Sequence, residues 1–178
     1  DNANNKQDQV LANIGTQAPR TLGAFGDIDV FFMSESGVRS LRARDSSNMA
    51  STDDVGSAVD GELLNFARSL DEALVRRAVS IAEPFEGRYL LAVGPVIYVF
   101  SHFPGAKVSA WTTYDLEELG ADRVVTDWAV TDTQLVARVA DRLCMYGGLS
   151  AEQYDTTAAF GYKVALPFPD PHTPTTKT

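Results

Sequence analysis

The sequence predicts an all-β fold with one short helix, built from antiparallel four-stranded meanders. Short apolar segments, rich in β-branched and aromatic residues, recur between turns of Gly, Pro and Asp. One segment alone, about 57–70, repeats its apolar residues at helical spacing. Hydrophobic residues make up 44% of the 178 positions, so the chain is long and apolar enough for one domain with a buried core.

The chain opens with a polar lead-in, residues 1–24, and then forms a hairpin. We expect the lead-in to be loop, with a short strand at 10–14 that would pair with a part absent from this sequence. The β-branched and aromatic run 28–33 is followed by turn residues at 34–37, where Gly37 can adopt a positive φ. Residues 38–42 then alternate apolar and polar side chains, as a half-buried strand does.

A helix is predicted over about 57–70 as an insertion between strands. Ser57 would cap it, with Asp60 three residues later in the manner of a capping box. Its apolar positions continue to Leu74, so the helix could run on toward Arg76. Residues 43–57, before the helix, are rich in Ser, Asp and Ala and are predicted to form an extended loop.

Two groups of about four strands follow, each spanning about 40–45 residues, which is the blade period of a β-propeller. Trp111 and Trp128 are expected to pack between blades, and a β-sandwich is the alternative architecture. Residues 25–166 would then hold about two blades and part of a third, and 167–178, with four prolines, would be a linker or domain edge. The predicted strands are 78–82, 88–93, 96–101, 107–114, 123–130, 134–139, 143–146 and 160–166.

Composition and motifs argue against an enzyme, a cofactor or metal site, and a membrane span. The net charge of −9 disfavours tight binding of nucleic acid, which needs clustered Lys and Arg. Cys144 is the single cysteine, two histidines are present, and no nucleophile-elbow, phosphate-loop or zinc motif occurs. The longest apolar stretch, 89–100, is interrupted by Gly-Pro, so it does not predict a membrane helix.

Carboxylates leave two other interpretations open. A pair of them could hydrolyse glycosides, although carboxylates are common as solvated residues on any acidic surface. A calcium loop at 115–122 is the other, although its spacing differs from that of an EF-hand.

An arginine-rich segment is the one candidate contact site. Arg39, Arg42 and Arg44 alternate with small or apolar residues and are expected on one face of a strand, followed by Asp45. Arginine pairs with carboxylates through two parallel hydrogen bonds, so we expect ion pairs within the fold or with a neighbouring subunit. The acidic surroundings make DNA a poorer partner.

Several segments resemble structural proteins of tailed phages. The stretch from Asp29 to Asn48, the meander 88–112 with its Ser109-Ala110-Trp111, and the closing Leu166–Asp170 with the prolines after it carry the resemblance. They are similar to the tail nozzle (tail tubular protein B) and packaged-DNA stabilisation proteins of short-tailed bacteriophages. The resemblance covers most of 25–178, and the chain would be a portion of a longer or processed polypeptide.

The resemblance implies a virion protein with a β-propeller platform and no catalytic residue. Such a protein would form a homo-oligomer, a hexameric ring, that attaches to the tail adaptor ring and contacts tail fibres or spikes. DNA would pass during retention and ejection without tight binding, and assembly would take place in the host cytoplasm. A tail module that binds a receptor or glycan is the first alternative, and a propeller glycoside hydrolase is the second.

Overall fold

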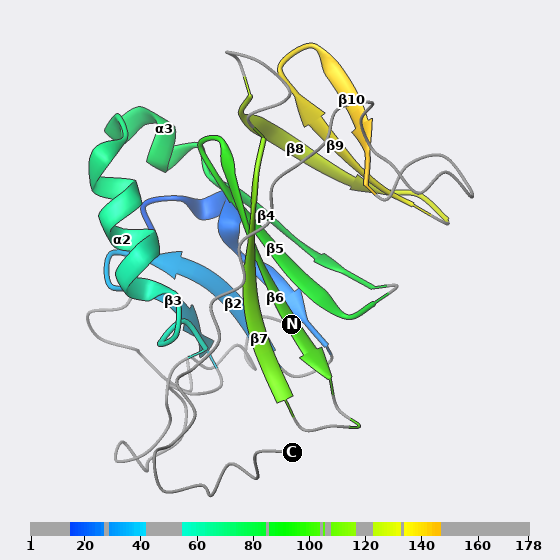
Figure 1. Ribbon diagram of the computed structural model, residues 1–178, viewed down its shortest axis with the longest axis horizontal. Helices are drawn as coiled ribbons and strands as arrows, with labels where there is room; N and C mark the ends of the chain where they lie inside the picture. Colours follow the sequence, from blue (N-terminus) through cyan, green and yellow to red (C-terminus); the bar gives the residue numbers. More distant parts are fainter. Residues whose placement is uncertain are drawn as a thin grey trace, which may run out of the picture.

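The computed structural model describes residues 15–26, 29–41, 55–84, 86–103, 105, 108–116, 123–132 and 134–146 (Figure 1). Within these ranges the chain forms three antiparallel sheets and two short α-helices. The mostly β fold predicted from the sequence is therefore confirmed.

The first sheet has the order β1-β2-β3, with β1 at Gly23–Phe25, β2 at Asp29–Ser34 and β3 at Gly37–Ser40. Strands β2 and β3 form the predicted hairpin, with Ser34 opposite Gly37, and Gly37 has a φ of +120°. The loop prediction was wrong for the end of the lead-in, where a 3-10 turn η2 (Pro19–Thr21) precedes β1. A three-residue strand starting Gly-Ala shows no alternation, and its position depends on pairing with β2.

The helical segment is divided into α2 (Asp60–Ser69) and α3 (Glu72–Arg76). The chain is extended at Leu70, and Asp71 starts α3 by accepting a hydrogen bond from the Ala73 backbone N–H at 2.8 Å. The predicted Ser57 cap was wrong: Val59 occupies the N-cap of α2, without a side-chain cap bond. The Asp60 side chain contacts β3 instead of completing a capping box.

The middle sheet is the predicted four-stranded meander, in the order β4-β5-β6-β7. Its strands are β4 (Val79–Glu83), β5 (Arg88–Val93), β6 (Val96–Phe103) and β7 (Val108–Asp115). Consecutive strands pair throughout, and β6 and β7 pair over eight positions without a register shift.

The third sheet has the order β10-β9-β8, with β8 at Val125–Val130, β9 at Leu135–Val139 and β10 at Arg142–Met145. A register irregularity interrupts β8 between Val125 and Asp127. The predicted strands at 10–14 and 160–166 and the Pro-rich segment 167–178 lie outside the described residues.

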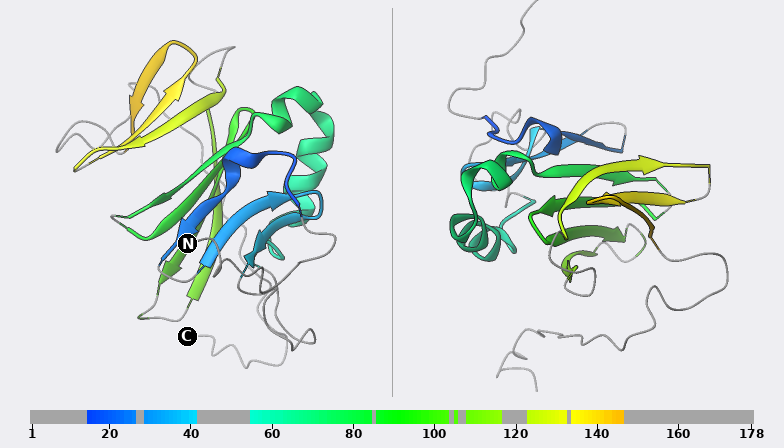
Figure 2. Two further views of the ribbon diagram at one scale, coloured as in Figure 1. Left: turned by 180° about the vertical axis from the view of Figure 1, so that it is seen from behind. Right: turned by 90° about the horizontal axis from the view of Figure 1, so that it is seen from above.

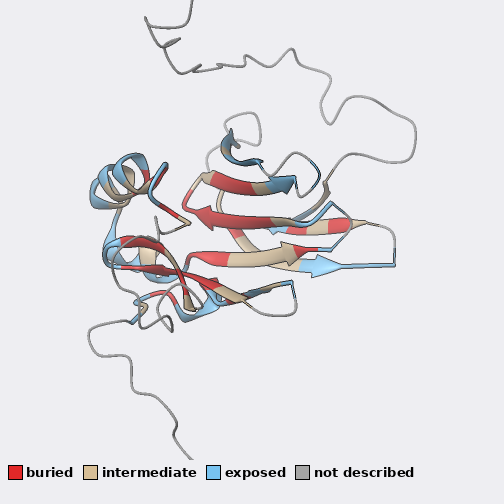
Figure 3. Cartoon of the chain, turned by 90° about the horizontal axis from the view of Figure 1, so that it is seen from below, coloured by how far each residue is buried: buried red, intermediate tan, exposed pale blue. Residues whose placement is uncertain are grey.

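The three sheets pack as layers, with the middle sheet between the other two (Figures 1 and 2). One face of the middle sheet packs on the first sheet and α2 through an aromatic cluster, which includes Phe31, Tyr89, Tyr98 and Phe100. Its other face packs on the third sheet through an aliphatic cluster. That cluster consists of Val79, Leu90, Ala92, Ile97, Val99, Val125, Leu135, Ala137 and Val139. Burial is concentrated in the strands, whereas the helices are largely intermediate or exposed (Figure 3).

The first strands of the three sheets lie side by side, since β4 contacts both β1 and β8. Each sheet then continues strand by strand away from this row. Three layers differ from the two of a β-sandwich, and the arrangement is consistent with successive propeller blades.

Candidate functional site

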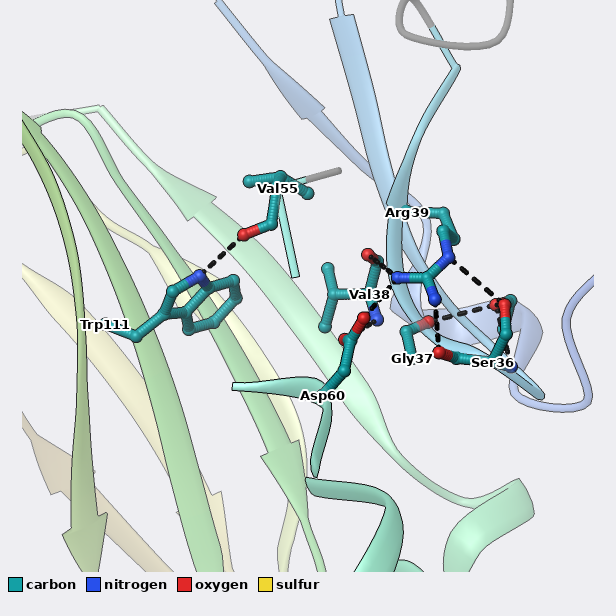
Figure 4. A network of polar contacts seen from close by, with 8 residues as sticks. Ser36, Gly37, Val38, Arg39, Val55, Asp60 and Trp111 are labelled. Carbon is teal, nitrogen blue, oxygen red and sulfur yellow. Dashed lines mark hydrogen bonds and ion pairs between the residues drawn. The ribbon is translucent and has the colours of Figure 1, made fainter. Parts of the chain in front are cut away.

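The predicted contact residue Arg39 lies in a polar network between the β2–β3 hairpin and α2 (Figure 4). Its guanidinium forms an ion pair with Asp60, and both side chains are largely buried, at 12% and 16% exposed. The other Asp60 oxygen accepts a hydrogen bond from the Val38 backbone N–H at 2.9 Å. Arg39 also donates to the Val38 carbonyl at 2.7 Å and to the Ser36 hydroxyl at 3.1 Å. This arginine is thus used within the fold.

Two glycines make room for the Asp60 carboxylate. A Cβ at Gly37 would lie 2.0 Å from the nearest Asp60 oxygen, and a Cβ at Gly56 would lie 2.2 Å from it. Backbone and arginine donors surround the carboxylate, so the site satisfies a buried charge that would otherwise be costly.

The other three members of the predicted set, Arg42, Arg44 and Asp45, lie outside the described residues. Strand β3 ends at Ser40, so the described strand does not carry the three arginines on one face as predicted. Positions 39 and 42 are also three positions apart, and this odd offset places their side chains on opposite faces of any regular strand.

Trp111 joins β7 to the segment before α2. Its indole N–H donates to the Val55 carbonyl at 2.8 Å, and its ring lies 5.2 Å from that of Phe100. Trp128 in β8 packs against the aliphatic cluster between the middle and third sheets. Each tryptophan therefore packs against one of the two core clusters of the middle sheet, and their place between propeller blades stays a prediction.

A second polar network joins the middle and third sheets and was missed in the sequence. Arg88 of β5 pairs with the buried Glu83 of β4 at 3.4 Å and with Glu86 at 2.8 Å. Its guanidinium lies 5.0 Å from the ring centre of Tyr146, directly after β10, and donates to the Tyr146 hydroxyl at 3.2 Å. That hydroxyl donates to Tyr114 of β7 at 3.0 Å. Burial raises the pKa of Tyr146, and the hydrogen bond with Tyr114 raises it further.

Arg20 and Thr21 of η2 contact strands of the middle and third sheets. The Thr21 carbonyl accepts hydrogen bonds from Tyr89 at 2.8 Å and from Ser80 at 2.7 Å. Arg20 donates to the Thr126 carbonyl at 2.9 Å and pairs with Asp127. The hydrogen bond from Arg20 lowers the pKa of Asp127, which keeps this carboxyl ionised. A glycosidase general acid needs a raised pKa, so Asp127 does not have the character of the general acid of such a pair.

A groove of about 450 Å³ lies between the two helices and the β2–β3 hairpin. Its lining includes the apolar residues Met33, Ala67, Leu70 and Val75 and the charged residues Glu35, Arg68 and Glu72. None of its lining residues is a His, Cys or Asp.

The described part of the chain contains no group of three or more His, Cys, Asp or Glu placed to hold a metal ion. The proposed calcium loop falls largely at 117–122, outside the described residues. Among the described helices, none is long and apolar enough to cross a membrane.

No protein-family model, curated protein or solved structure matches this chain.

Proposed function

We propose that this chain is a structural subunit of the tail of a short-tailed phage, part of a nozzle or tube ring through which DNA is retained and ejected. The observation that carries the proposal is the layered meander, with the first strands of three sheets side by side. This is the arrangement that successive blades of a propeller platform require. The resemblance of segments in 25–178 to nozzle proteins supplies the virion context.

The use of charged residues supports a structural role. Arg39 with Asp60 and Arg88 with Glu83 are each paired at a junction between elements of the fold. Arginines engaged in this way position sheets and helices and are not presented to a phosphate backbone. The net charge of −9 would let DNA pass a surface of this protein without adhering to it.

The experiment is negative-stain averaging of the full-length polypeptide, with and without the adaptor ring, together with anisotropy of labelled duplex DNA. The proposal expects a ring with a central hole and no DNA binding at physiological salt. Particles without rotational symmetry, combined with binding to a glycan array, would replace it with a receptor-binding tail module.

A further inference from the structure

Strand β7 and the end of β6 form an exposed apolar surface on the side of the third sheet. The aliphatic cluster identifies this face, because Ile97 and Val99 of β6 belong to that cluster. Tyr114 and Thr112 lie opposite these two residues, so every second residue of β7 faces the third sheet. The β7 surface consists of Phe103, Val108, Ala110, Thr112 and Tyr114. Its three large hydrophobic side chains are between 41% and 54% exposed.

The third sheet stops one strand short of covering the β7 surface. Among the described residues it has three strands, against four in the middle sheet. Its first strand, β8, lies beside β4, the first strand of the middle sheet. Because both sheets continue strand by strand from that row, the place over β7 corresponds to a fourth strand beyond β10.

The chain leaves the third sheet close to this place. Tyr146, directly after β10, donates a hydrogen bond to the Tyr114 hydroxyl at 3.0 Å, and the two rings lie 6.0 Å apart. Residues 147–159 then lead to the predicted strand 160–166. A connection of this length spans up to about 45 Å. Neighbouring strands lie about 4.8 Å apart and a seven-residue strand is about 23 Å long, so the chain can return beside β10.

Residues 160–166 have the side-chain pattern that this place requires. One face of a strand here is formed by Phe160, Tyr162, Val164 and Leu166. The other face is formed by Gly161, Lys163 and Ala165. The apolar face and the β7 surface are both uncharged, so their contact buries no unpaired charge. A second copy of the chain would bring a further net charge of −9, whereas a tethered segment has a high effective concentration.

The opposite face of β7 shows a corresponding contact already formed. There the chain between β3 and α2 lies on β7, and the Trp111 indole N–H donates to the Val55 carbonyl at 2.8 Å. Both residues pack against the aromatic cluster. The chain that follows the third strand of the first sheet therefore covers one face of β7. The chain that follows the third strand of the third sheet is in the matching position for the other face.

We propose that the β7 surface is an intramolecular docking site for residues 160–166, which add antiparallel to β10 as the fourth strand of the third sheet. The apolar face of this strand packs on β7, and Lys163 faces solvent. The Tyr146 N–H donates to the Leu135 carbonyl at 2.8 Å, and backbone direction alternates along β10. The backbone groups of Leu143 and Met145 therefore bond the added strand. This docking occurs within one copy, so it is independent of the proposed tail function.

Cys144 of β10 provides a direct test, because it packs against the aliphatic cluster and so shares a face with the apolar side of the added strand. Residues opposite each other in a non-hydrogen-bonded pair have Cα atoms about 4.5 Å apart, within the range of a disulfide. Tyr162→Cys and Val164→Cys are made one at a time in the full-length polypeptide. The faster of the two should form an intrachain disulfide with Cys144 at least tenfold faster than Lys163→Cys, the control on the opposite face.

Mild oxidation followed by non-reducing electrophoresis and peptide mass spectrometry measures these rates. Equal rates for the three variants would overturn the proposed docking. Disulfides formed mainly between copies would also overturn it, because the strand would then come from a neighbouring molecule.

Amide hydrogen exchange gives a second readout, with Val164→Asp compared with Ala165→Asp in the full-length polypeptide. Each variant adds one carboxylate, the first on the apolar face and the second on the solvent face. The Leu143 and Met145 amides should exchange at least tenfold faster in Val164→Asp than in the wild type, and at the wild-type rate in Ala165→Asp. Protection of the β5 amides checks that both variants fold.

Equal exchange of the Leu143 and Met145 amides in all three proteins would contradict the docking. A closed ring observed together with that result would leave the proposed tail function standing. Docking without a ring would remove the tail function alone.

Discussion

The two faces of the middle sheet are packed by different chemistry. Toward the first sheet, the rings of Phe25, Phe31, Tyr89 and Phe100 contact one another at centroid distances of 4.7 to 5.7 Å. Toward the third sheet, the contact is aliphatic, and the polar network of Arg88, Glu83 and Tyr146 joins the two sheets. The first interface therefore depends on ring packing, and the second depends partly on charges that must be satisfied together.

This difference indicates how each layer is held. Aromatic pairs contribute about 0.5–1.5 kcal/mol beyond the area they bury, so the first sheet is fixed by many overlapping contacts. A buried ion pair contributes little net stability, but its disruption leaves an uncompensated charge. We therefore expect the third sheet to be the more sensitive of the two to single charge changes and the less sensitive to loss of apolar volume.

The largest effect is expected from Phe31→Ala. This ring contacts Phe25, Tyr89 and Phe100, so its removal should cost about 4 kcal/mol, toward the upper end for a buried phenylalanine. The matched change in the other interface, Leu135→Ala, should cost about 2–3 kcal/mol. Urea unfolding measures both, and an equal or larger loss for Leu135→Ala would contradict the comparison.

Arg88→Met should destabilise the chain by about 3 kcal/mol, because it leaves the buried Glu83 carboxylate without its arginine. The double variant Arg88→Met with Glu83→Gln should recover part of that loss, since the charge then left without Arg88 is the exposed Glu86 and no longer the buried Glu83. Hydrogen exchange should show the loosening in β8–β10 before β5 and β6.

The control for this charge effect is Arg76→Met, which breaks the exposed pair with Glu72. It should cost about 0.5 kcal/mol or less, as exposed helical pairs do. If the two arginine variants lose equal stability, the Arg88 network does not hold the third sheet.

Asp60→Asn should cost about 2 kcal/mol, because the amide keeps the volume but loses the charge that pairs with Arg39 and weakens the bond from the Val38 N–H. Thermal unfolding measures the effect, with Glu35→Gln as the control because Glu35 is exposed and accepts one bond from Gln17. A neutral Asp60→Asn would show that the network in Figure 4 contributes little to joining α2 to the hairpin.

The ionisation of the buried tyrosines should change the stability of the fold least at neutral pH and most in alkali. Burial raises the pKa of Tyr98 to about 12 and also raises the pKa of Tyr89 above its ordinary value of 10.0. The folded state then holds these protons more tightly than the unfolded state, so stability is full below pH 10 and falls as the pH rises from 10 to 12. Denaturant unfolding across this range measures it, and Tyr89→Phe should reduce the fall. A stability that is flat to pH 12 would contradict the burial of these hydroxyls.

Much of this fold could be predicted because period-two alternation and turn residues are local signals. Strands β4 to β10 and the β2–β3 hairpin were found in this way, with boundaries shifted by at most two residues. Strand β1 carries no such signal, since Gly23 and Ala24 have almost no side chain, and its order comes from pairing with β2. Ser57 was predicted as a cap because Asp60 lies at the spacing of a capping box. The sequence does not show that the Asp60 side chain pairs with Arg39 instead.

The sites show the same limit. Arg39 was identified from the pattern of arginines, but its partner lies 21 positions away and is set by tertiary contact. The Arg88 network combines residues of β4, β5 and β7 with Tyr146 at the end of the third sheet. Arg88 and Tyr146, which share a hydrogen bond, are 58 positions apart in the sequence. Nothing in the local sequence distinguishes Arg88 from an exposed arginine at the start of a strand.

We propose that these layered sheets belong to the platform of a ring-forming tail subunit. Native mass spectrometry of the full-length polypeptide, over a range of concentrations and with adaptor present, tests it most directly. We expect one closed homo-oligomer, with the mass of six copies, that persists on dilution. A monomer at every concentration would contradict it.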